Sequence, residues 1–273
     1  MIKEDNTMKE HEIPCELCGE VYDPDELIPF DDRLICPECL ENETTLCACC
    51  GRGDYASQIL SQACKHDGSL GNGFELVTHP MSLEYHQEEM PWPEVLHTAR
   101  SLGYRSHQTQ TCGLHVHVSR KAFWETEAEQ EPAIARILYF VEKHWEELLK
   151  FSRRTPRQLE RWAARYGYKD RPQEILEHAK KGSHAGRYSC VNLENRATIE
   201  FRMFRGTLKL NSLLATLQMV DHICSVALHL SDGACKDLSW RTFVTGCHEP
   251  ELVQYLKERR LYVNEPVEGG EEI

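Results

Sequence analysis

The 273-residue sequence contains no apolar run of the roughly 18 to 20 residues that a membrane-spanning helix needs. Its first residues, MIKEDNTMKEHEI, are polar and acidic, so they lack the basic start and apolar middle of a secretory signal. We therefore expect a cytoplasmic protein without a membrane partner. The composition, 41% hydrophobic and 27% charged residues, is typical of a folded globular protein.

The sequence also lacks an excess of positive charge. Its 31 lysines and arginines are outnumbered by 44 aspartates and glutamates, which gives a net charge of −13. Fourteen acidic but only three basic residues lie in residues 1–50, and four glutamates lie in the last ten residues. Because Lys and Arg supply the affinity for a nucleic-acid backbone, we expect no nucleic-acid partner.

Cysteine is plentiful but unevenly placed, with eight of thirteen residues in the first 64. In a reducing compartment such a cluster is more typical of metal binding than of disulfides. Two C-x2-C pairs, separated by 17 residues, predict one structural zinc ion held by Cys15, Cys18, Cys36 and Cys39. The alternative, reduced structural cysteines, is disfavoured because so short and polar a segment has little core to bury them in.

A second finger begins at Cys47 and Cys50, which repeat the C-x2-C-G form of the first pair. Its second C-x2-C pair is missing, because Cys64 and His66 alone follow at a suitable distance. Either these two residues complete an irregular zinc site, or the second finger is half missing. We assign residues 1–50 to an acidic zinc-binding module and residues 51–64 to a junction.

Alternation at period two predicts strands after residue 70, each with one face on a core. In residues 113–120 the apolar set Leu114, Val116 and Val118 alternates with His115, His117 and Ser119. In residues 197–208, Ile199, Phe201 and Met203 alternate with Glu200, Arg202 and Phe204. Residues 73–80 are expected to form another strand that carries Glu75, and residues 187–193 can pair with 197–208 as a hairpin.

Periodicity near 3.6 predicts helices over residues 91–104, 131–151, 209–230 and 249–260. This order of elements predicts an α+β fold, a mainly antiparallel sheet with helices on one face, preceded by the small zinc-knuckle module. The acidic tail over 264–273 is expected to be disordered.

The segment Glu200-x-Arg202-x-x-Arg205 suggests a site, because a carboxylate beside a guanidinium can hold a divalent cation next to a phosphoryl group. Glu75, His115 and His117 could supply further ligands. The bland alternative is a surface sheet with an internal Glu–Arg pair and half-exposed histidines. A basic stretch could also face polyphosphate, although each residue alone fits a solvated helix surface; it comprises Arg153, Arg154, Arg157, Lys180, Lys181 and Arg187.

Three ordered segments, KHDGSLGNGFELVTHPMS, CGLHVHVS and YSCVNLENRATIEFRMFRGTL, resemble the amidoligase family. This family is related to glutamine synthetase and glutamate–cysteine ligase, which join a carboxylate to an amine. The resemblance implies a glutamine synthetase-like domain, which we place over residues 65–263. It also implies ATP-dependent formation of an amide or isopeptide bond through an acyl phosphate, with Mg²⁺ and arginines around the transferred phosphoryl group.

The resemblance also implies roles for single residues. Glu75 and Glu200 would be metal ligands, and His115 or His117 a metal or phosphate contact. Arg202 and Arg205 would bind phosphate or the substrate carboxylate. The residues expected to line the nucleotide site are Asp67, Ser69, Ser119, Arg187 and Asn192.

One departure from the family pattern bears on activity. Family members open the ligase domain with a strand of the form G-[VI]-E-[FLIV]-E, whose glutamates bind metal, and only DYASQILSQAC stands at that place here. An internal deletion near residues 51–60 would explain both this absence and the half-missing finger. Glu75 and Glu200 alone would hold Mg²⁺ weakly.

Three functions follow. The first is an ATP-dependent ligase of small-molecule or peptide carboxylates and amines, impaired to the extent that the missing glutamates are needed. The second is a catalytically inactive ligase-like domain that binds a partner protein through its zinc module. The third, a metal-dependent hydrolase built on His115 and His117, lacks a further His/Asp pair at a suggestive spacing.

Overall fold

The computed structural model describes residues 13–30, 33–46, 53–55, 64–65, 73, 75–106, 109, 111–182 and 186–262, with the backbone alone for 42–46, 53–55 and 64–65. The chain divides into two compact units, Met1–Ser82 and Leu83–Ile273, and each is described by itself. Several predictions fall outside the described residues: those for Cys47, Cys50, His66, Asp67, Ser69 and the tail over 264–273.

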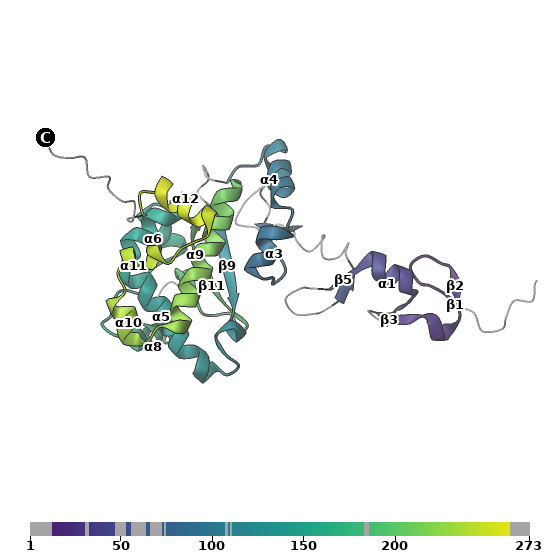
Figure 1. Ribbon diagram of the computed structural model, residues 1–273, viewed down its shortest axis with the longest axis horizontal. Helices are drawn as coiled ribbons and strands as arrows, with labels where there is room; N and C mark the ends of the chain where they lie inside the picture. The colour runs from purple at the N-terminus through teal and green to yellow at the C-terminus, as the bar shows by residue number, and fades with distance from the viewer. Residues whose placement is uncertain are drawn as a thin grey trace, which may run out of the picture. The chain divides into compact units, whose positions relative to one another are not determined.

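The first unit is built from short antiparallel strand pairs (Figure 1). β1 (Ile13–Pro14) pairs with β2 (Val21–Tyr22), and β3 (Ile28–Phe30) pairs with β4 (Arg33–Ile35). The 3-10 helix η1 (Pro24–Glu26) joins the two hairpins, and α1 (Pro37–Glu43) follows the second. Two further pairs are β5 (Thr44–Leu46) with β6 (Gly53–Tyr55), and β7 (Cys64–Lys65) with β8 (Glu75–Leu76).

The strand expected over residues 73–80 is shorter than predicted. Its pairing covers Glu75 and Leu76, opposite Lys65 and Cys64, and residues 77–80 have no regular structure. Alternation marks the two faces of an extended segment but does not supply a partner strand, so the pattern alone does not extend the pairing. Glu75 is exposed and belongs to the first unit.

The second unit contains a three-stranded antiparallel sheet with the order β10-β11-β9. β9 spans Gly113–Ser119, β10 spans Val191–Asn192 and β11 spans Thr198–Arg205. The expected hairpin between residues 187–193 and 197–208 is confirmed by the pairing of β10 with β11. β9, distant in sequence, pairs along the other edge of β11 (Figure 1).

Helices make up most of the second unit. The two longest are α5 (Glu127–Lys143) and α9 (Leu210–His229). The helix expected over 131–151 is two helices, α5 and α6 (Trp145–Ser152), because His144 leaves helical geometry at φ −104° and ψ 32°. The others are α3 (Leu83–Glu88), α4 (Trp92–Ser101), η2 (Arg120–Phe123), α7 (Pro156–Trp162), α8 (Pro172–Lys180), η3 (Gly186–Tyr188), α10 (Asp232–Asp237), α11 (Trp240–Thr245) and α12 (Pro250–Glu258).

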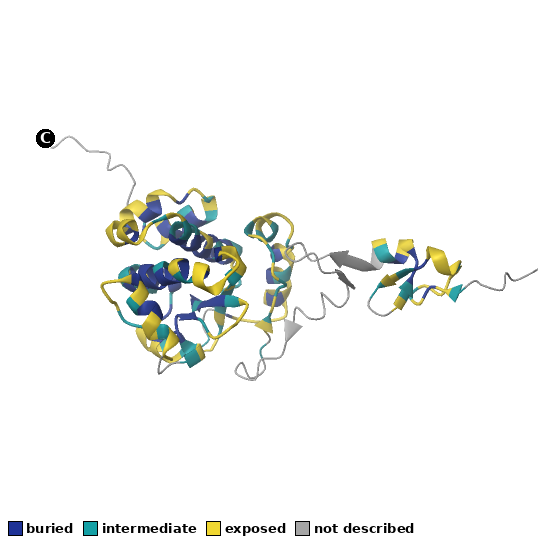
Figure 2. Cartoon of the chain, turned by 90° about the horizontal axis from the view of Figure 1, so that it is seen from below, coloured by how far each residue is buried: buried dark blue, intermediate teal, exposed yellow. Residues whose placement is uncertain are grey.

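One apolar core joins one face of the sheet to these helices. Ile199, Phe201 and Met203 of β11 are fully buried in it together with the inward residues of α5 and α9, and Leu114, Val116 and Val118 of β9 pack against it. The buried positions line the inner sides of the helices in Figure 2. The expected mixture of helices with antiparallel sheet is confirmed, and the glutamine synthetase-like fold stays a prediction. Among the described residues, no helix is long and apolar enough to cross a membrane.

Candidate functional site

The second face of the sheet is organised around Glu200. This residue lies on the central strand β11, directly opposite His117 of β9 on one side and Asn192 of β10 on the other. Only 4% of Glu200 is exposed. A carboxylate so placed needs hydrogen-bond donors, since burial of an unpaired charge is costly.

Both oxygens of Glu200 have such partners. Asn192 donates from Nδ2 to Oε2 over 2.8 Å, and Nδ1 of His115 lies 3.2 Å from Oε1. Arg202 also donates from Nη1 to Oε1. Nε2 of His117 lies 3.7 Å from the same oxygen, beyond hydrogen-bond distance, while its Nδ1 contacts Thr198 Oγ1 at 3.1 Å. The structure thus brings together five residues that the sequence singled out.

These contacts keep Glu200 ionised. Burial opposes its charge, but the hydrogen bonds from His115 and Asn192 and the charge of Arg202 outweigh burial and hold the pKa of Glu200 at about 2. At neutral pH the site therefore presents a fixed negative charge on a rigid strand. Such a charge suits a cation or a donor on a substrate, and it does not suit a proton-transferring acid.

A β-bulge decides where Arg205 lies. The register runs from Phe201 opposite Val116 to Phe204 opposite Leu114, so Arg202 and Met203 together face the single residue His115. Strict alternation placed Phe204 beside Glu200, and this prediction is wrong, because the extra residue returns Phe204 to the core with 1% exposure. Arg205 then pairs with Gly113 and falls on the same face as Glu200 and His115.

Gly113 makes room for a third guanidinium. A Cβ built on Gly113 would overlap Nη2 of Arg154 and would lie 2.8 Å from Nε2 of His115. Arg154, in the loop between α6 and α7, is 8% exposed and donates from Nη2 to the carbonyl oxygen of Cys112 over 3.3 Å. Burial, and next the charges of Arg202 and Arg205, lower the pKa of Arg154 to about 10.

In the sequence alone Arg154 carried little weight, since it stood in a basic run that suited a solvated surface. The sequence feature that could have indicated Arg154 is Gly113, the first residue of β9. Its partner Arg154, however, lies about forty residues further along the chain. Residue spacing does not encode such a contact. Arg157, Lys180 and Lys181 of the same run are exposed, as expected for a helix surface.

The remaining predicted residues lie at the edges of this face or elsewhere. Ser119 is exposed and pairs with Thr198 at the end of the ladder. Arg187 is exposed on η3, with its guanidinium carbon 4.9 Å from the centre of the Tyr188 ring. The guanidinium carbon of Arg202 lies 5.6 Å from the same ring. The ring of Tyr188 therefore contacts both Arg187 and Arg202, and it links Arg187 to the residues around Glu200.

Comparison with known proteins adds the family. A family model described as "Putative amidoligase enzyme" matches residues 53–224, which include all three strands of the face just described. The chain belongs to the amidoligase family. No curated protein and no solved structure matches it. The match begins at Gly53, so it includes the segment that we assigned to a junction, and the family resemblance found in the sequence is confirmed.

The fit of a magnesium ion to this amidoligase face depends on the oxygen ligands that the face offers. Mg²⁺ takes oxygen ligands in octahedral geometry and is usually held by one or two carboxylates together with substrate phosphates. Glu200 is buried and ionised, but His115 and Arg202 already contact its Oε1. Among the described residues the cluster does not bring three ligand side chains within 4.8 Å of one another. It fits an ion shared with phosphate oxygens rather than one held by the protein alone.

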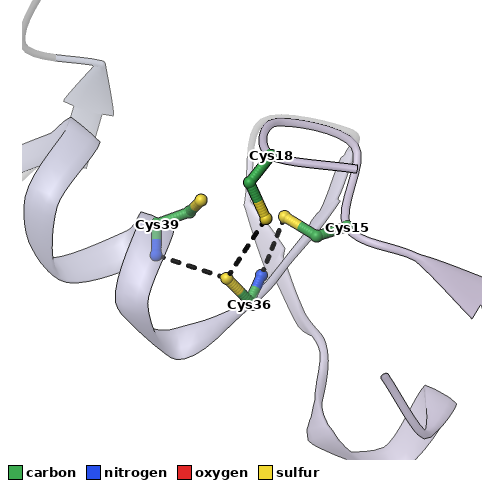
Figure 3. Close-up of side chains that lie close together, drawn as sticks. All are labelled: Cys15, Cys18, Cys36 and Cys39. Atoms are coloured by element: carbon green, nitrogen blue, oxygen red, sulfur yellow. Dashed lines mark hydrogen bonds between the residues drawn. The ribbon is translucent and has the colours of Figure 1, made fainter. Parts of the chain in front are cut away.

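A second site in this amidoligase lies in the first unit. The sulfur atoms of Cys15, Cys18, Cys36 and Cys39 lie within 4.8 Å of one another. Figure 3 shows how the four side chains gather between the turn and α1. Cys15 and Cys18 come from the turn between β1 and β2, where Gly19 adopts φ +79°, a conformation that favours glycine. Cys36 precedes α1 and Cys39 lies in it. Four converging sulfur atoms suit a tetrahedral metal ion such as zinc.

Backbone groups prepare these thiols for a metal. The amide of Cys36 donates to Sγ of Cys15 over 3.3 Å, and the amide of Cys39 donates to Sγ of Cys36 over 3.4 Å. Burial opposes the Cys15 thiolate, but the amides of Cys18 and Cys36 outweigh it and lower the pKa of Cys15 to about 6. A metal binds thiolates rather than thiols, so the local fold favours the binding form of Cys15 and Cys36, whereas burial raises the pKa of Cys39.

Proposed function

We propose that the chain is an ATP-dependent carboxylate–amine ligase that forms an amide or isopeptide bond through an acyl phosphate. The observation that carries this proposal is the buried, ionised Glu200 held between two histidines, Asn192 and Arg202 on one face of the sheet in a member of the amidoligase family. The substrates would be a small-molecule or peptide carboxylate and an amine.

The reaction has two steps. A carboxylate oxygen of the substrate attacks the γ-phosphorus of ATP, the bond to the β-phosphate oxygen breaks, and ADP leaves. The amine then attacks the acyl carbon, inorganic phosphate leaves with the electron pair of the broken bond, and the nitrogen loses a proton. Neither step needs a redox partner, and both build negative charge that must be neutralised in place.

The residues of the face would divide this work. Glu200, with His115 or His117, would hold Mg²⁺ together with the nucleotide phosphates, and the ion would neutralise phosphate charge. Arg202 and Arg205 would contact the transferred phosphoryl group or the reacting carboxylate, because a guanidinium fork matches both. Asn192 would orient Glu200 through its 2.8 Å hydrogen bond. Pre-positioned charges of this kind lower the barrier without reorganisation during the reaction.

A second candidate function is a catalytically inactive ligase-like domain in which the zinc module binds a protein partner. It is favoured by the missing E-x-E strand and by the cluster's failure, among the described residues, to form a metal site of its own. The buried contacts of Glu200 would then serve stability alone.

The test is calorimetric titration of Mg·ATP into the full chain and into Glu200→Gln, with Glu160→Gln as control. Glu160 is an exposed glutamate on α7, so its variant removes the same charge away from the face. The ligase proposal expects binding by the parent and the control and loss of binding in Glu200→Gln. Hydroxylamine added with candidate carboxylates should then give a hydroxamate and one ADP per turnover. Absence of Mg·ATP binding in the parent would favour the inactive domain.

A further inference from the structure

The face of the sheet that carries Glu200, His115 and Arg205 is called the ligand face. An open cleft of about 580 Å³ lies at its Arg205 end. Five basic residues and one acidic residue line it: Lys150, Arg153, Arg154, Arg205, Arg259 and Glu146. They come from α6 and the loop after it, from the last residue of β11 and from the C-terminal end of α12. The size suits a small-molecule group, since such sites span about 300–1,000 Å³.

The cations of this cleft are held by backbone oxygens. Arg259 donates from Nη2 to the carbonyl of Lys150 over 2.8 Å, and Lys150 donates from Nζ to the carbonyl of Arg260 over 3.1 Å. Arg205 donates from Nη1 to the carbonyl of Arg153 over 3.3 Å. Carbonyl groups fix the geometry of a cation without cancelling its charge, so these residues are positioned and remain positive.

Glu146 lines the cleft, but among the described residues no carboxylate pairs with its basic side chains. Within the part of the chain that the structure describes, none of the five basic residues forms a salt bridge. The buried Nε of Arg205 has no hydrogen-bond partner there. A buried donor left without a partner costs free energy, so the protein contacts of Arg205 do not fully satisfy its guanidinium group.

The charge also concentrates toward the ligand face. Arg154 and Arg205 both line the cleft, and Arg154 is close enough to Arg202 for their charges to interact. The guanidinium groups therefore form a row that begins at Arg202, which contacts Glu200, and continues through Arg154 and Arg205 into the cleft. A substrate that binds near Glu200 through one group can place a second, negatively charged group along this row.

We propose that the cleft binds an oxyanion, a carboxylate or phosphate group that the ligase's substrate or nucleotide carries in addition to the group bound near Glu200. The inference rests on the proposed function and narrows it, because it requires a ligand with two anionic ends. Arg205 and Arg154 hold the oxyanion through their forked donors, and Lys150 and Arg259 supply charge at the mouth of the cleft.

The experiment titrates two probes without magnesium into the full chain: tripolyphosphate, which represents nucleotide phosphates, and a tri-glutamate peptide, which represents an acidic carboxylate substrate. The variants are Lys150→Met and Arg259→Met, and the control is Lys236→Met on α10. Lys236 is exposed like Lys150, and it does not line the cleft. We expect at least one probe to bind, with its affinity lowered about tenfold by either cleft variant and unchanged by the control.

The two probes distinguish the two possible sources of the oxyanion, the nucleotide and the carboxylate substrate. Cleft-dependent binding of tripolyphosphate assigns the cleft to the nucleotide, and cleft-dependent binding of the peptide assigns it to the carboxylate substrate. Equal affinities in all four proteins, or no binding of either probe, would overturn the inference. The ligase proposal is tested separately, since Mg·ATP binding that depends on Glu200 would survive failure of the cleft, and the cleft could bind an anion in a chain that has no ligase activity.

Discussion

Gly113 leaves the space that Nη2 of Arg154 occupies, and this contact joins β9, the strand of His115 and His117, to the loop between α6 and α7. Any larger residue at position 113 would have to displace the guanidinium or the His115 ring, because an added Cβ would lie 2.8 Å from Nε2 of His115. The two residues are distant in sequence, so the glycine acts on the site through tertiary packing.

Gly113→Ala is therefore expected to move the guanidinium of Arg154 and to lower stability by about 1 kcal/mol, through loss of its hydrogen bond to the carbonyl of Cys112. If the ligand face binds Mg·ATP, the same variant should weaken that binding. Urea unfolding and calorimetry measure the two effects. The control is Gly233→Ala on α10, where the added Cβ would meet only Ser231 Oγ at 4.0 Å and should cost little. Unchanged stability and binding in Gly113→Ala would contradict the packing described here.

Glu200 should make the free energy of unfolding depend on pH in the acidic range. The pKa of a glutamate is about 4.3 in an unfolded chain, and here it is about 2. The ionised carboxylate thus adds stability above pH 4.3, and that stability is lost as the pH falls toward 2. The shift corresponds to about 3 kcal/mol.

Urea unfolding of the parent and of Glu200→Gln should differ by about 3 kcal/mol at pH 7 and by about half of that at pH 3. The glutamine removes the charge but leaves Arg202 buried beside a neutral group, which adds to the loss. Glu160→Gln, the exposed control, should match the parent at both pH values. A difference that did not shrink with acid would show that the charge of Glu200 is not stabilised by its neighbours.

The sequence predicted the parts of this site that depend on local pattern. Period-two alternation found β9 and β11, and the C-x2-C spacing found four cysteines that do converge. The bulge was not predictable, because alternation assigns Phe204 and Arg205 to the opposite faces from those they occupy. Arg154 contacts residues about forty positions away, and no local pattern records this contact. The pairing of β8 is also shorter than its alternation indicated.

His144 should impose a second pH dependence, in which stability also falls with acid but over a higher pH range. Burial, together with the charge of Lys143, lowers its pKa to about 4, against the hydrogen bond of its ring to the carbonyl of Leu238. The unfolded chain takes up this proton near pH 6.5, so stability is full above that value and falls as the pH drops toward 4. Between pH 7.5 and pH 5 the loss is about 2 kcal/mol.

The check is urea unfolding of the parent and of His144→Gln at these two pH values. Glutamine can keep a donor to Leu238 but does not titrate, so the variant should lose this part of the pH dependence. His97→Gln removes an exposed histidine on α4 and should retain it. If the parent and His144→Gln lost the same stability on acidification, burial of a neutral His144 would not be the cause.

The cysteine cluster predicts that the first unit needs its metal. Among the described residues, the core around Cys15 and Cys36 contains five buried residues, too few to hold these strands and α1 without a cross-link or a metal. Chelation should therefore remove hydrogen-exchange protection from residues 13–41 and leave β9, β11 and α9 protected, since their core is separate.

Zinc content distinguishes the two interpretations of the second finger. One ion per chain, lost in Cys39→Ser and kept in Cys112→Ser, is expected if the second finger is half missing. Two ions per chain, of which Cys39→Ser removes one, would mean that Cys47 and Cys50 find further ligands in Cys64 and His66. The metal count would then bear on the deletion hypothesis, because a complete second site leaves the missing E-x-E strand as a separate loss.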